Sequence, residues 1–316
     1  MTYMSLCTPS STTLPRATHA MNAPQVTGAL TTRTIKAGSR QIFVAERGQG
    51  PVMLMLHGGG PGASGLSNYA RNVEALSLHY RVIVPDMPGY GRSSKGLDRS
   101  DPFGDLAASM LALLDALGIE RAHVVGNSLG GACAVRMAME RSRSVGRLIL
   151  MGPGGVDTTR RPPTAGLKSL LNYYRGEGPT LDKLTTFIRQ YLVHDSSRVS
   201  DAVISERFNA SIDPEVVAHP PLLRPKLITN FRKLDFTRDK RLSSVQNPTL
   251  VLWGTEDKVN RPSGAQSLQT RLPNCDVYLF SKTGHWVQWE RADDFNAVVL
   301  AFLAQDPIYA RARAAD

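Results

Sequence analysis

Short apolar runs alternate with amphipathic stretches along most of this chain. Continuous apolar runs, which are typical of strands buried on both faces of a sheet, recur at five places: residues 52–56, 81–85, 123–125, 147–151 and 249–253. Residues 40–46 alternate only weakly, and residues 277–280 predict one further strand. Strands that alternate with helices predict a mostly parallel sheet with helices on both faces, an α/β fold.

The stretches between these runs have helical spacing. One apolar stripe recurs at the intervals of a helix face: Leu106, Met110, Leu113, Leu114 and Leu117. Asp105 is the expected cap at the start of this helix, and Gly118 is expected to end it. Further helices are predicted near residues 263–271 and 292–303.

The strand pattern disappears in the middle of the chain. Three helices are expected there: residues 167–174, 181–192 and 201–210. We therefore interpret residues 156–245 as a helical lid inserted into a core that comprises residues 25–155 and 246–305. Residues 1–24 are rich in Ser, Thr and Pro and predict a disordered tail, and residues 306–316 form a C-terminal tail. The pattern does not decide whether translation starts at Met1, Met4 or Met21.

Composition narrows the class of protein. The net charge of +10 over 316 residues allows an anionic partner, but no basic helical stripe or nucleic-acid motif accompanies it, so nucleic-acid binding is not expected. No apolar run reaches the roughly 18 residues that cross a membrane, and the N-terminus lacks the pattern of a secretory signal. The cysteines, Cys7, Cys133 and Cys275, are scattered as in a reduced protein, so we expect a cytoplasmic location.

A serine stands at a tight turn between a predicted strand and a predicted helix. The sequence Gly126-Asn127-Ser128-Leu129-Gly130 has the form of a nucleophile elbow, which presents a serine hydroxyl above a parallel sheet. Small residues beside the serine allow the strand and helix backbones to approach closely. The pentapeptide alone is a weak signal, because an ordinary glycine-rich loop has the same composition.

Two further residues are candidates for the base and the carboxylate that a catalytic serine needs. A neutral hydroxyl is a poor nucleophile at pH 7 and needs a base, which in turn needs an orienting carboxylate. Asp257 follows the strand predicted at 249–253, and His285 follows the strand at 277–280. The order Ser, Asp, His is that of the α/β-hydrolases, and Glu256 is a less suitable rival for the acid.

A glycine-rich loop follows the strand at residues 52–56. Its glycines allow backbone N–H groups to turn toward a developing oxyanion, and we expect donors from Gly59 or Gly60 and from Leu129, which follows the serine. A phosphate loop would continue with Gly-Lys-Ser/Thr, which is absent here. The seven histidines show no paired metal-ligand spacing, so neither a metal nor a cofactor is expected.

Together these segments resemble the meta-cleavage product hydrolases, α/β-hydrolases that split a carbon–carbon bond in ring-fission products of aromatic or steroid catabolism. Six stretches carry the resemblance: residues 57–72, 86–91, 126–131, 150–155, 253–257 and 284–290. The similarity extends over about residues 30–304 and is weakest in the lid. It implies a small anionic substrate, a 2-hydroxy-6-oxo-hexa-2,4-dienoate, and cleavage to 2-hydroxypenta-2,4-dienoate and a carboxylic acid.

The resemblance also implies residue roles. Ser128 would be the nucleophile, or would activate a water, and His285 would move protons. Arg207 matches the lid arginine that holds the substrate carboxylate, and further polar contacts match three residues: Asn68, Asn127 and Trp286. Members of the family are commonly oligomers, so a homo-oligomer is expected.

Several alternatives stay open on the sequence alone. The group on the substrate ketone could be phenyl, alkyl or steroid-derived, and the reaction could pass through an acyl-enzyme or a gem-diol. A serine esterase or lactonase of the same fold needs the triad but not Arg207, Asn68 and Trp286 together. A hydrolase fold that only binds a partner is the other alternative, and the complete triad argues against it.

Overall fold

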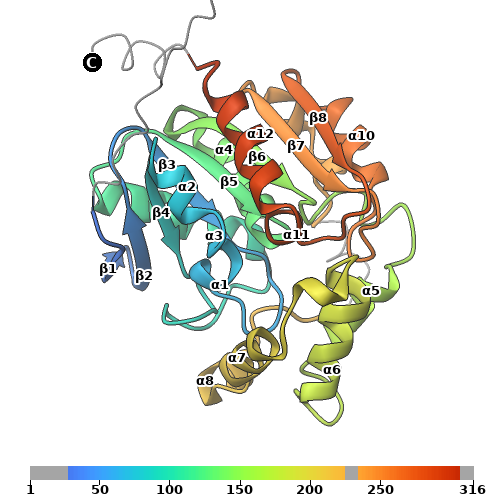
Figure 1. The fold of residues 1–316 in the computed structure, drawn as a ribbon. Coiled ribbons are helices and arrows are strands. Elements are labelled where there is room, and N and C mark those ends of the chain that lie inside the picture. Colours follow the sequence, from blue (N-terminus) through green and yellow to red (C-terminus); the bar gives the residue numbers. More distant parts are fainter. Residues whose placement is uncertain (1–27, 225–233, 307–316) are drawn as a thin grey trace, which may run out of the picture.

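An eight-stranded sheet forms the centre of the molecule in the computed structural model, which describes residues 28–224 and 234–306 (Figure 1). The strands lie in the order β1-β2-β4-β3-β5-β6-β7-β8. Their bounds are β1 (Thr31–Ala37), β2 (Arg40–Arg47), β3 (Val52–Leu56), β4 (Arg81–Pro85), β5 (Ala122–Asn127), β6 (Val145–Met151), β7 (Thr249–Gly254) and β8 (Cys275–Phe280). The predicted tail at residues 1–24 and residues 307–316 lie outside the described part.

The sheet is mostly parallel, as predicted. Every pair from β4 and β3 through to β8 is parallel, whereas β2 runs antiparallel to both β1 and β4. Strand β1 was not predicted, because most of its side chains are exposed and its sequence lacks an apolar run. It adds a hairpin at the edge of the sheet, far from the residues proposed for catalysis.

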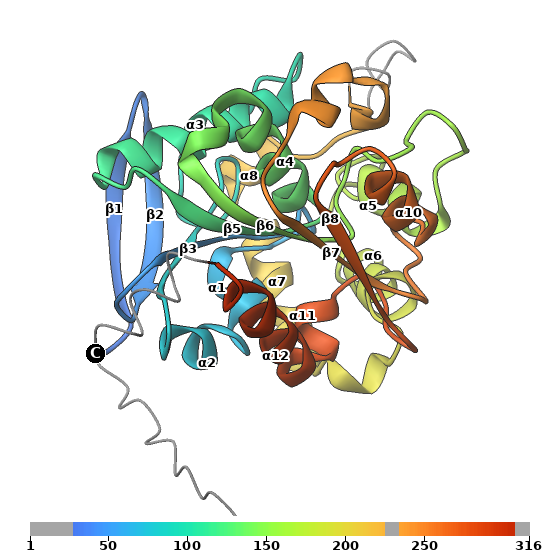
Figure 2. The ribbon, with the colours of Figure 1, turned by 90° about the horizontal axis from the view of Figure 1, so that it is seen from above.

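Helices cover both faces of the sheet, and the side chains of β3 show why. Leu54 and Leu56 pack with one apolar cluster beside α3 (Pro102–Ala116) and α4 (Leu129–Arg141). Met53 and Met55 point to the other face, where the cluster includes α12 (Ala292–Leu303). Figure 2 shows these two helical layers with the sheet between them. The other core helices are α1 (Gly65–Tyr69), α2 (Val73–Ser77), α10 (Ser263–Gln269) and α11 (Val287–Glu290).

The start of α3 corrects one prediction. The cap is Asp101, whose carboxylate accepts the Gly104 N–H at 3.1 Å, and Pro102 occupies the first helical position. Asp105 lies within the first turn and instead forms an ion pair with Arg40 at 2.8 Å. An earlier acidic residue followed by proline was the stronger signal for a helix start.

The lid helices lie beyond the ends of the central strands, in the lower part of Figure 1. They are α5 (Ala165–Asn172), α6 (Leu181–Thr186), α7 (Asp201–Ser211) and α8 (Pro214–Ala218). The helix expected over residues 181–192 is divided, because α6 widens into a π-helical turn at Phe187–Leu192. A third apolar cluster joins this turn to Trp286 and Trp289 of the core, so the lid is packed on the segment that follows β8.

Candidate active site

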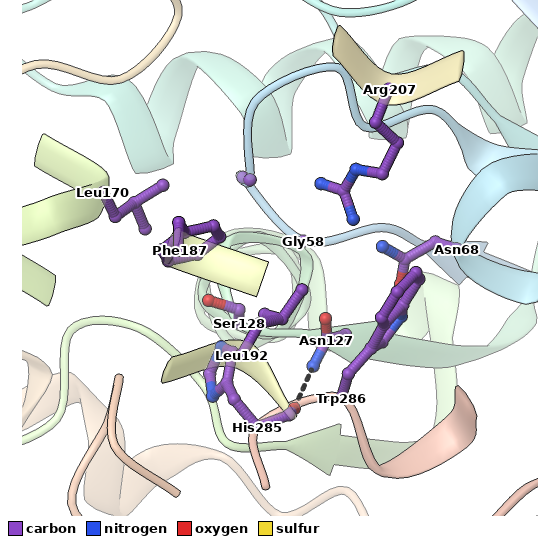
Figure 3. Close-up of a pocket in the computed structure, with 12 residues that line it drawn as sticks. Gly58, Asn68, Asn127, Ser128, Leu170, Phe187, Leu192, Arg207, His285 and Trp286 are labelled. Carbon is purple, nitrogen blue, oxygen red and sulfur yellow. Dashed lines mark hydrogen bonds between the residues drawn. The ribbon is translucent and has the colours of Figure 1, made fainter. Parts of the chain in front are cut away.

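The turn that carries Ser128 joins β5 to α4 and is unusually tight. Ser128 has φ 51° and ψ −109°, a conformation that residues other than glycine rarely adopt. A Cβ atom on Gly126 would lie 2.4 Å from the Gly130 carbonyl oxygen, and one on Gly130 would lie 2.1 Å from that of Leu56. Larger residues on either side of the serine would therefore clash. The turn places Ser128 in the wall of a chamber between the sheet and the lid (Figure 3).

Asp257 and His285, which follow β7 and β8, are in direct contact. Asp257 Oδ2 lies 2.7 Å from His285 Nδ1 and also accepts the Trp253 indole N–H at 2.9 Å. Its Oδ1 accepts the backbone N–H groups of Val259 and Asn260, both at 2.8 Å. These bonds fix the carboxylate, and the bond at Nδ1 leaves the imidazole lone pair on Nε2.

No hydrogen bond joins the His285 imidazole to the Ser128 hydroxyl in the described structure. His285 Nε2 is buried and has no hydrogen-bond partner among the described residues. Ser128 and His285 line the same chamber, on the same side of it (Figure 3). The chamber encloses about 10 Å³, room for about one water molecule. The rival acid, Glu256, is exposed and contacts Thr255 instead.

The carbonyl groups of the glycine-rich loop after β3 are all held by hydrogen-bond donors. Each carbonyl oxygen has its own donor: His57 Nδ1 for Gly58 (2.8 Å), the Tyr90 hydroxyl for Gly59 (3.1 Å), the Ala63 N–H for Gly60 (3.1 Å) and Arg207 for Pro61 (3.0 Å). The His57 tautomer follows from its other nitrogen, which accepts the Met87 N–H at 2.9 Å.

The opposite ends of these peptides supply the donors expected at an oxyanion. The two groups of a planar peptide point in opposite directions, so the N–H groups of Gly59 and Gly60 face away from those anchors. Both glycines line the chamber. Leu129 is the first residue of α4, and the N–H of a first helical residue has no partner within the helix. Gly59 and Gly60 therefore line the small chamber, and Leu129 follows Ser128 at the start of α4; their role as oxyanion donors stays a prediction.

Tyr90 was not singled out from the sequence, although it lies in the stretch 86–91. Tyr90→Phe removes the donor that holds the Gly59 carbonyl, so the Gly60 N–H should lose its fixed direction. We expect kcat to fall about tenfold, less than for loss of a donor itself, with KM little changed. Steady-state kinetics of Tyr90→Phe beside Tyr278→Phe, an exposed tyrosine on β8, would check this. A raised KM with normal kcat would contradict it.

Arg207 extends from α7 into the chamber and is almost completely buried, with 2% of its surface exposed. Its guanidinium donates twice to the Pro61 carbonyl, at 3.0 and 3.1 Å, and lies 5.2 Å from the Trp286 ring. It forms no salt bridge with any described residue. Burial lowers the pKa of Arg207 to about 10, so the group is still a cation at neutral pH. A buried cation without a counter-ion is well suited to bind an anion.

The other three residues predicted to bind substrate also line this chamber. Asn68 Oδ1 accepts the Gln288 amide at 2.5 Å, which leaves the Asn68 N–H groups for a ligand. Asn127 Nδ2 donates weakly, at 3.4 Å, to the Met151 and His285 carbonyls. The buried Trp286 indole N–H has no partner among the described residues.

Glu290 and Leu192 are site residues that sequence reasoning missed. The Leu192 carbonyl at the end of the π-helical turn accepts the His285 N–H at 2.8 Å. Glu290, which is buried, accepts the Gly284 N–H on one oxygen and two lid N–H groups, of His194 and Asp195, on the other. The lid and the loop that carries His285 are therefore joined by backbone N–H groups that donate to the Leu192 carbonyl, and by the Glu290 carboxylate, which binds N–H groups of both segments. The spacing from His285 to Glu290, within the stretch 284–290, was the available signal.

Glu290→Gln replaces one of those carboxylate oxygens by an NH₂ group that faces N–H donors. We expect the free energy of unfolding to fall by about 1–3 kcal/mol, and kcat to fall about tenfold because the imidazole loses its fixed position. Thermal melting and steady-state kinetics well below the melting temperature would separate the two effects. Glu215→Gln, on the exposed face of α8, is the control. A lower melting temperature with unchanged kcat would limit Glu290 to a structural role.

Neither a metal cluster nor a membrane span is visible within residues 28–224 and 234–306. No three His, Cys, Asp or Glu side chains of these ranges come together as metal ligands. Likewise, no helix there is long and apolar enough to cross a bilayer.

Comparison with known proteins places this site in a family. Residues 51–292 match the α/β-hydrolase fold family. A 2-hydroxy-6-oxononadienedioate/2-hydroxy-6-oxononatrienedioate hydrolase of Pseudomonas sp is 37% identical over 274 residues, 84% of this chain and 92% of that protein. A 2-hydroxy-6-oxo-6-phenylhexa-2,4-dienoate hydrolase of Burkholderia cepacia is 36% identical, over 84% of this chain and 91% of that protein. The chain belongs to the meta-cleavage product hydrolases.

A solved structure agrees with this assignment. The meta-cleavage product hydrolase CumD of Pseudomonas fluorescens IP01 superposes with a TM-score of 0.77 and 30% identity, over 86% of this chain and 97% of that one. This meta-cleavage product hydrolase therefore has the α/β-hydrolase fold predicted from its sequence, and the predicted membership of the family is confirmed.

Proposed function

We propose that this hydrolase cleaves the C5–C6 bond of 2-hydroxy-6-oxo-hexa-2,4-dienoates that carry a variable group on the C6 ketone. The products are 2-hydroxypenta-2,4-dienoate, or a substituted form of it, and a carboxylic acid. One observation carries the proposal beyond a general serine hydrolase. Arg207, a buried cation with no counter-ion among the described residues, lines the same chamber as Ser128 and His285.

Binding begins with the dienoate carboxylate. Arg207 takes it through charge-assisted hydrogen bonds, in a position where the carboxylate supplies the missing negative charge. The Asn68 amide, the Asn127 amide and the Trp286 indole N–H surround the same space and are donors for the oxygen at C2. The chamber, which encloses about 10 Å³, has to widen by movement of the lid side chains Phe187 and Leu192 before this end can take a flat, anionic, oxygen-rich group.

The first chemical step prepares the carbon–carbon bond for cleavage. The 2-hydroxyl gives up its proton, C2 becomes a ketone, and C5 gains a proton. His285 carries this proton on Nε2, which has no partner in the described structure, while Asp257 holds the ring at Nδ1. The resulting 2-keto group is conjugated with the C3=C4 double bond, to which C5 is attached, so it can accept the electrons of the C5–C6 bond when that bond breaks.

Cleavage follows by attack of the Ser128 oxygen on C6. His285 removes the hydroxyl proton, and the N–H groups of Gly59, Gly60 and Leu129 stabilise the oxyanion at C6. When the C5–C6 bond breaks, its electron pair moves through the conjugated system to the C2 oxygen. That oxygen takes the proton that His285 received from Ser128, so the imidazole is again a base. The acyl group stays on Ser128 until a water, deprotonated by His285, releases it as the carboxylic acid.

The experiment that tests this function is optical. Dienoates of this type are yellow and the products are not, so purified protein should bleach 6-methyl and 6-phenyl dienoates. Product analysis should show one carboxylic acid for each pentadienoate. Rapid hydrolysis of aryl esters with no bleaching of any dienoate would overturn the proposal and favour the esterase or lactonase alternative.

The proposal extends to the setting of the enzyme. The enzyme is a homo-oligomer in the cytoplasm, and its domains are a core of residues 25–155 and 246–305 and a lid of residues 156–245. Two features support the oligomer and the location. Tyr278 and Leu279 of the edge strand β8 are 45% and 51% exposed, and the described cysteines, Cys133 and Cys275, are unpaired. Light scattering after size exclusion would measure the mass in solution; a monomer would contradict the oligomer.

A further inference from the structure

A much larger cavity opens on the other side of Ser128. It encloses about 440 Å³ and shares Gly59, Ser128 and Leu170 with the small chamber. Ser128 therefore stands at the junction of two spaces with different chemistry. The small chamber holds the cation and the amides, and the large one lies where the group on the C6 ketone must extend once the dienoate carboxylate is on Arg207.

The wall of the large cavity near Ser128 is apolar. It is made by side chains from the segment after β4, from α3 and α4, from α5 and from the loop after β7: Leu97, Phe103, Leu129, Leu167, Leu171 and Val259. Most of these residues are also part of the apolar clusters that form the core and the lid. A surface of this kind binds apolar groups by shape and excludes hydrated ones.

The outer end of the same cavity is cationic. Three exposed arginines line it, Arg99, Arg175 and Arg224, and none of them forms an ion pair within the described residues. Arg99 donates to the Pro220 carbonyl and Arg175 to the Arg224 carbonyl, both at 3.2 Å. Two acidic side chains in the neighbouring sequence pair with other cations, since Asp101 binds Arg136 at 2.7 Å and Glu177 binds Lys183 at 3.4 Å. Asp98, which precedes Arg99, accepts the N–H and hydroxyl of Ser100 at 2.8 and 2.7 Å.

The volume of the large cavity indicates how large the group on the C6 ketone is. A cavity of about 150 Å³ is enough to hold a benzene ring. The large cavity has about 440 Å³, which is well beyond the needs of a methyl, propyl or phenyl substituent. A small substituent would leave much of the apolar wall in contact with water or empty space.

We propose that the group on the C6 ketone is a bulky apolar one, of two or more fused rings or equivalent length, that ends in an acidic group at the three arginines. The inference rests on the proposed function and names its substrate class. The released acid is then a dicarboxylate with a large apolar middle, and the preceding reaction is an oxygenative ring fission of an aromatic ring attached to that group.

The test compares four dienoates that differ only at C6: methyl, phenyl, naphthyl, and naphthyl with a propanoate chain. We expect kcat/KM to rise at least about tenfold from phenyl to naphthyl, and a further roughly fivefold with the propanoate. Failure to bleach any of the four defeats the proposed function itself. Cleavage of the methyl or phenyl compound as fast as the naphthyl ones, or no gain from the propanoate, overturns only this inference.

Two variants connect the preference to the cavity. Leu171→Trp fills the apolar wall and should lower kcat/KM for both naphthyl compounds about tenfold or more, and by much less for the methyl compound. Leu181→Trp, exposed on α6, is its control. Arg224→Gln should remove the gain from the propanoate, because the Arg224 guanidinium makes no hydrogen bond among the described residues. Arg143→Gln, exposed on the turn Ser142–Ser144, is the matched control. Equal losses on all four substrates would contradict the assignment.

Discussion

Ser128→Ala should reduce the rate of carbon–carbon cleavage by about three to six orders of magnitude. The loss is large because the substitution removes the atom that attacks C6, and the oxyanion donors and Arg207 stabilise the transition state without replacing it. The Ser128 hydroxyl makes no hydrogen bond in the described structure, so its removal should leave the fold intact. Binding should persist, because the carboxylate chamber is unchanged. Stopped-flow bleaching under single-turnover conditions, at several protein concentrations, would measure both the rate of cleavage and the affinity for the dienoate.

A second experiment with the same variant separates an acyl-enzyme from a gem-diol. With wild-type protein and a slowly hydrolysed substrate, mass spectrometry of the intact protein should show the acyl group on Ser128, and Ser128→Ala should show none. Ser243→Ala, which changes an exposed serine, is the control and should match wild type. Bleaching by Ser128→Ala within tenfold of the wild-type rate, or an acyl group elsewhere, would overturn the assigned nucleophile.

Arg207→Gln should lower kcat/KM for dienoates by about 30-fold to several thousandfold, which corresponds to the 2–5 kcal/mol lost when a desolvated charge pair loses one partner. Glutamine can still donate a hydrogen bond to the Pro61 carbonyl, so the oxyanion loop should keep its shape. Hydrolysis of neutral aryl esters, which have no carboxylate for Arg207 to bind, should therefore change little. The ratio of dienoate to ester turnover is the measurement.

The control for this prediction is Arg189→Gln, which removes an exposed lid arginine that pairs with Asp201. It should leave both activities near the wild-type values. If Arg207→Gln reduced ester and dienoate turnover equally, Arg207 would be an anchor of the loop and not a site for the substrate anion.

The parts of this site that the sequence predicts are those set by local chain geometry. The glycines beside Ser128 impose a tight turn, and residues at the ends of parallel strands meet at one edge of a sheet. For this reason the sequence predicts that Asp257 and His285 lie close together, and the two side chains are in contact in the structure. Arg207, Asn68 and Trp286 came from the resemblance, because no spacing rule connects α7, α1 and the segment after β8.

The features that could not be predicted depend on contacts between distant segments. Tyr90 reaches the Gly59 carbonyl, and Glu290 reaches backbone N–H groups of the lid. No periodic pattern of residues in the sequence indicates either contact. The π-helical turn at residues 187–192 was read as ordinary helix because both have a similar apolar spacing. Strand β1 has too few buried side chains to be distinguished from a loop.

The hydrogen bonds that join Leu192 to His285, and His194 and Asp195 to the Glu290 carboxylate, limit how such enzymes can be recombined. A chimera that exchanges the whole lid between two relatives would also exchange the groups that hold the imidazole. Junctions placed so that residues 192–195 stay with the parent of Glu290 would preserve the proton relay, while the walls contributed by α5 and α7 could diverge. New substrate ranges are therefore easiest to reach by changing those walls and keeping this short connecting segment.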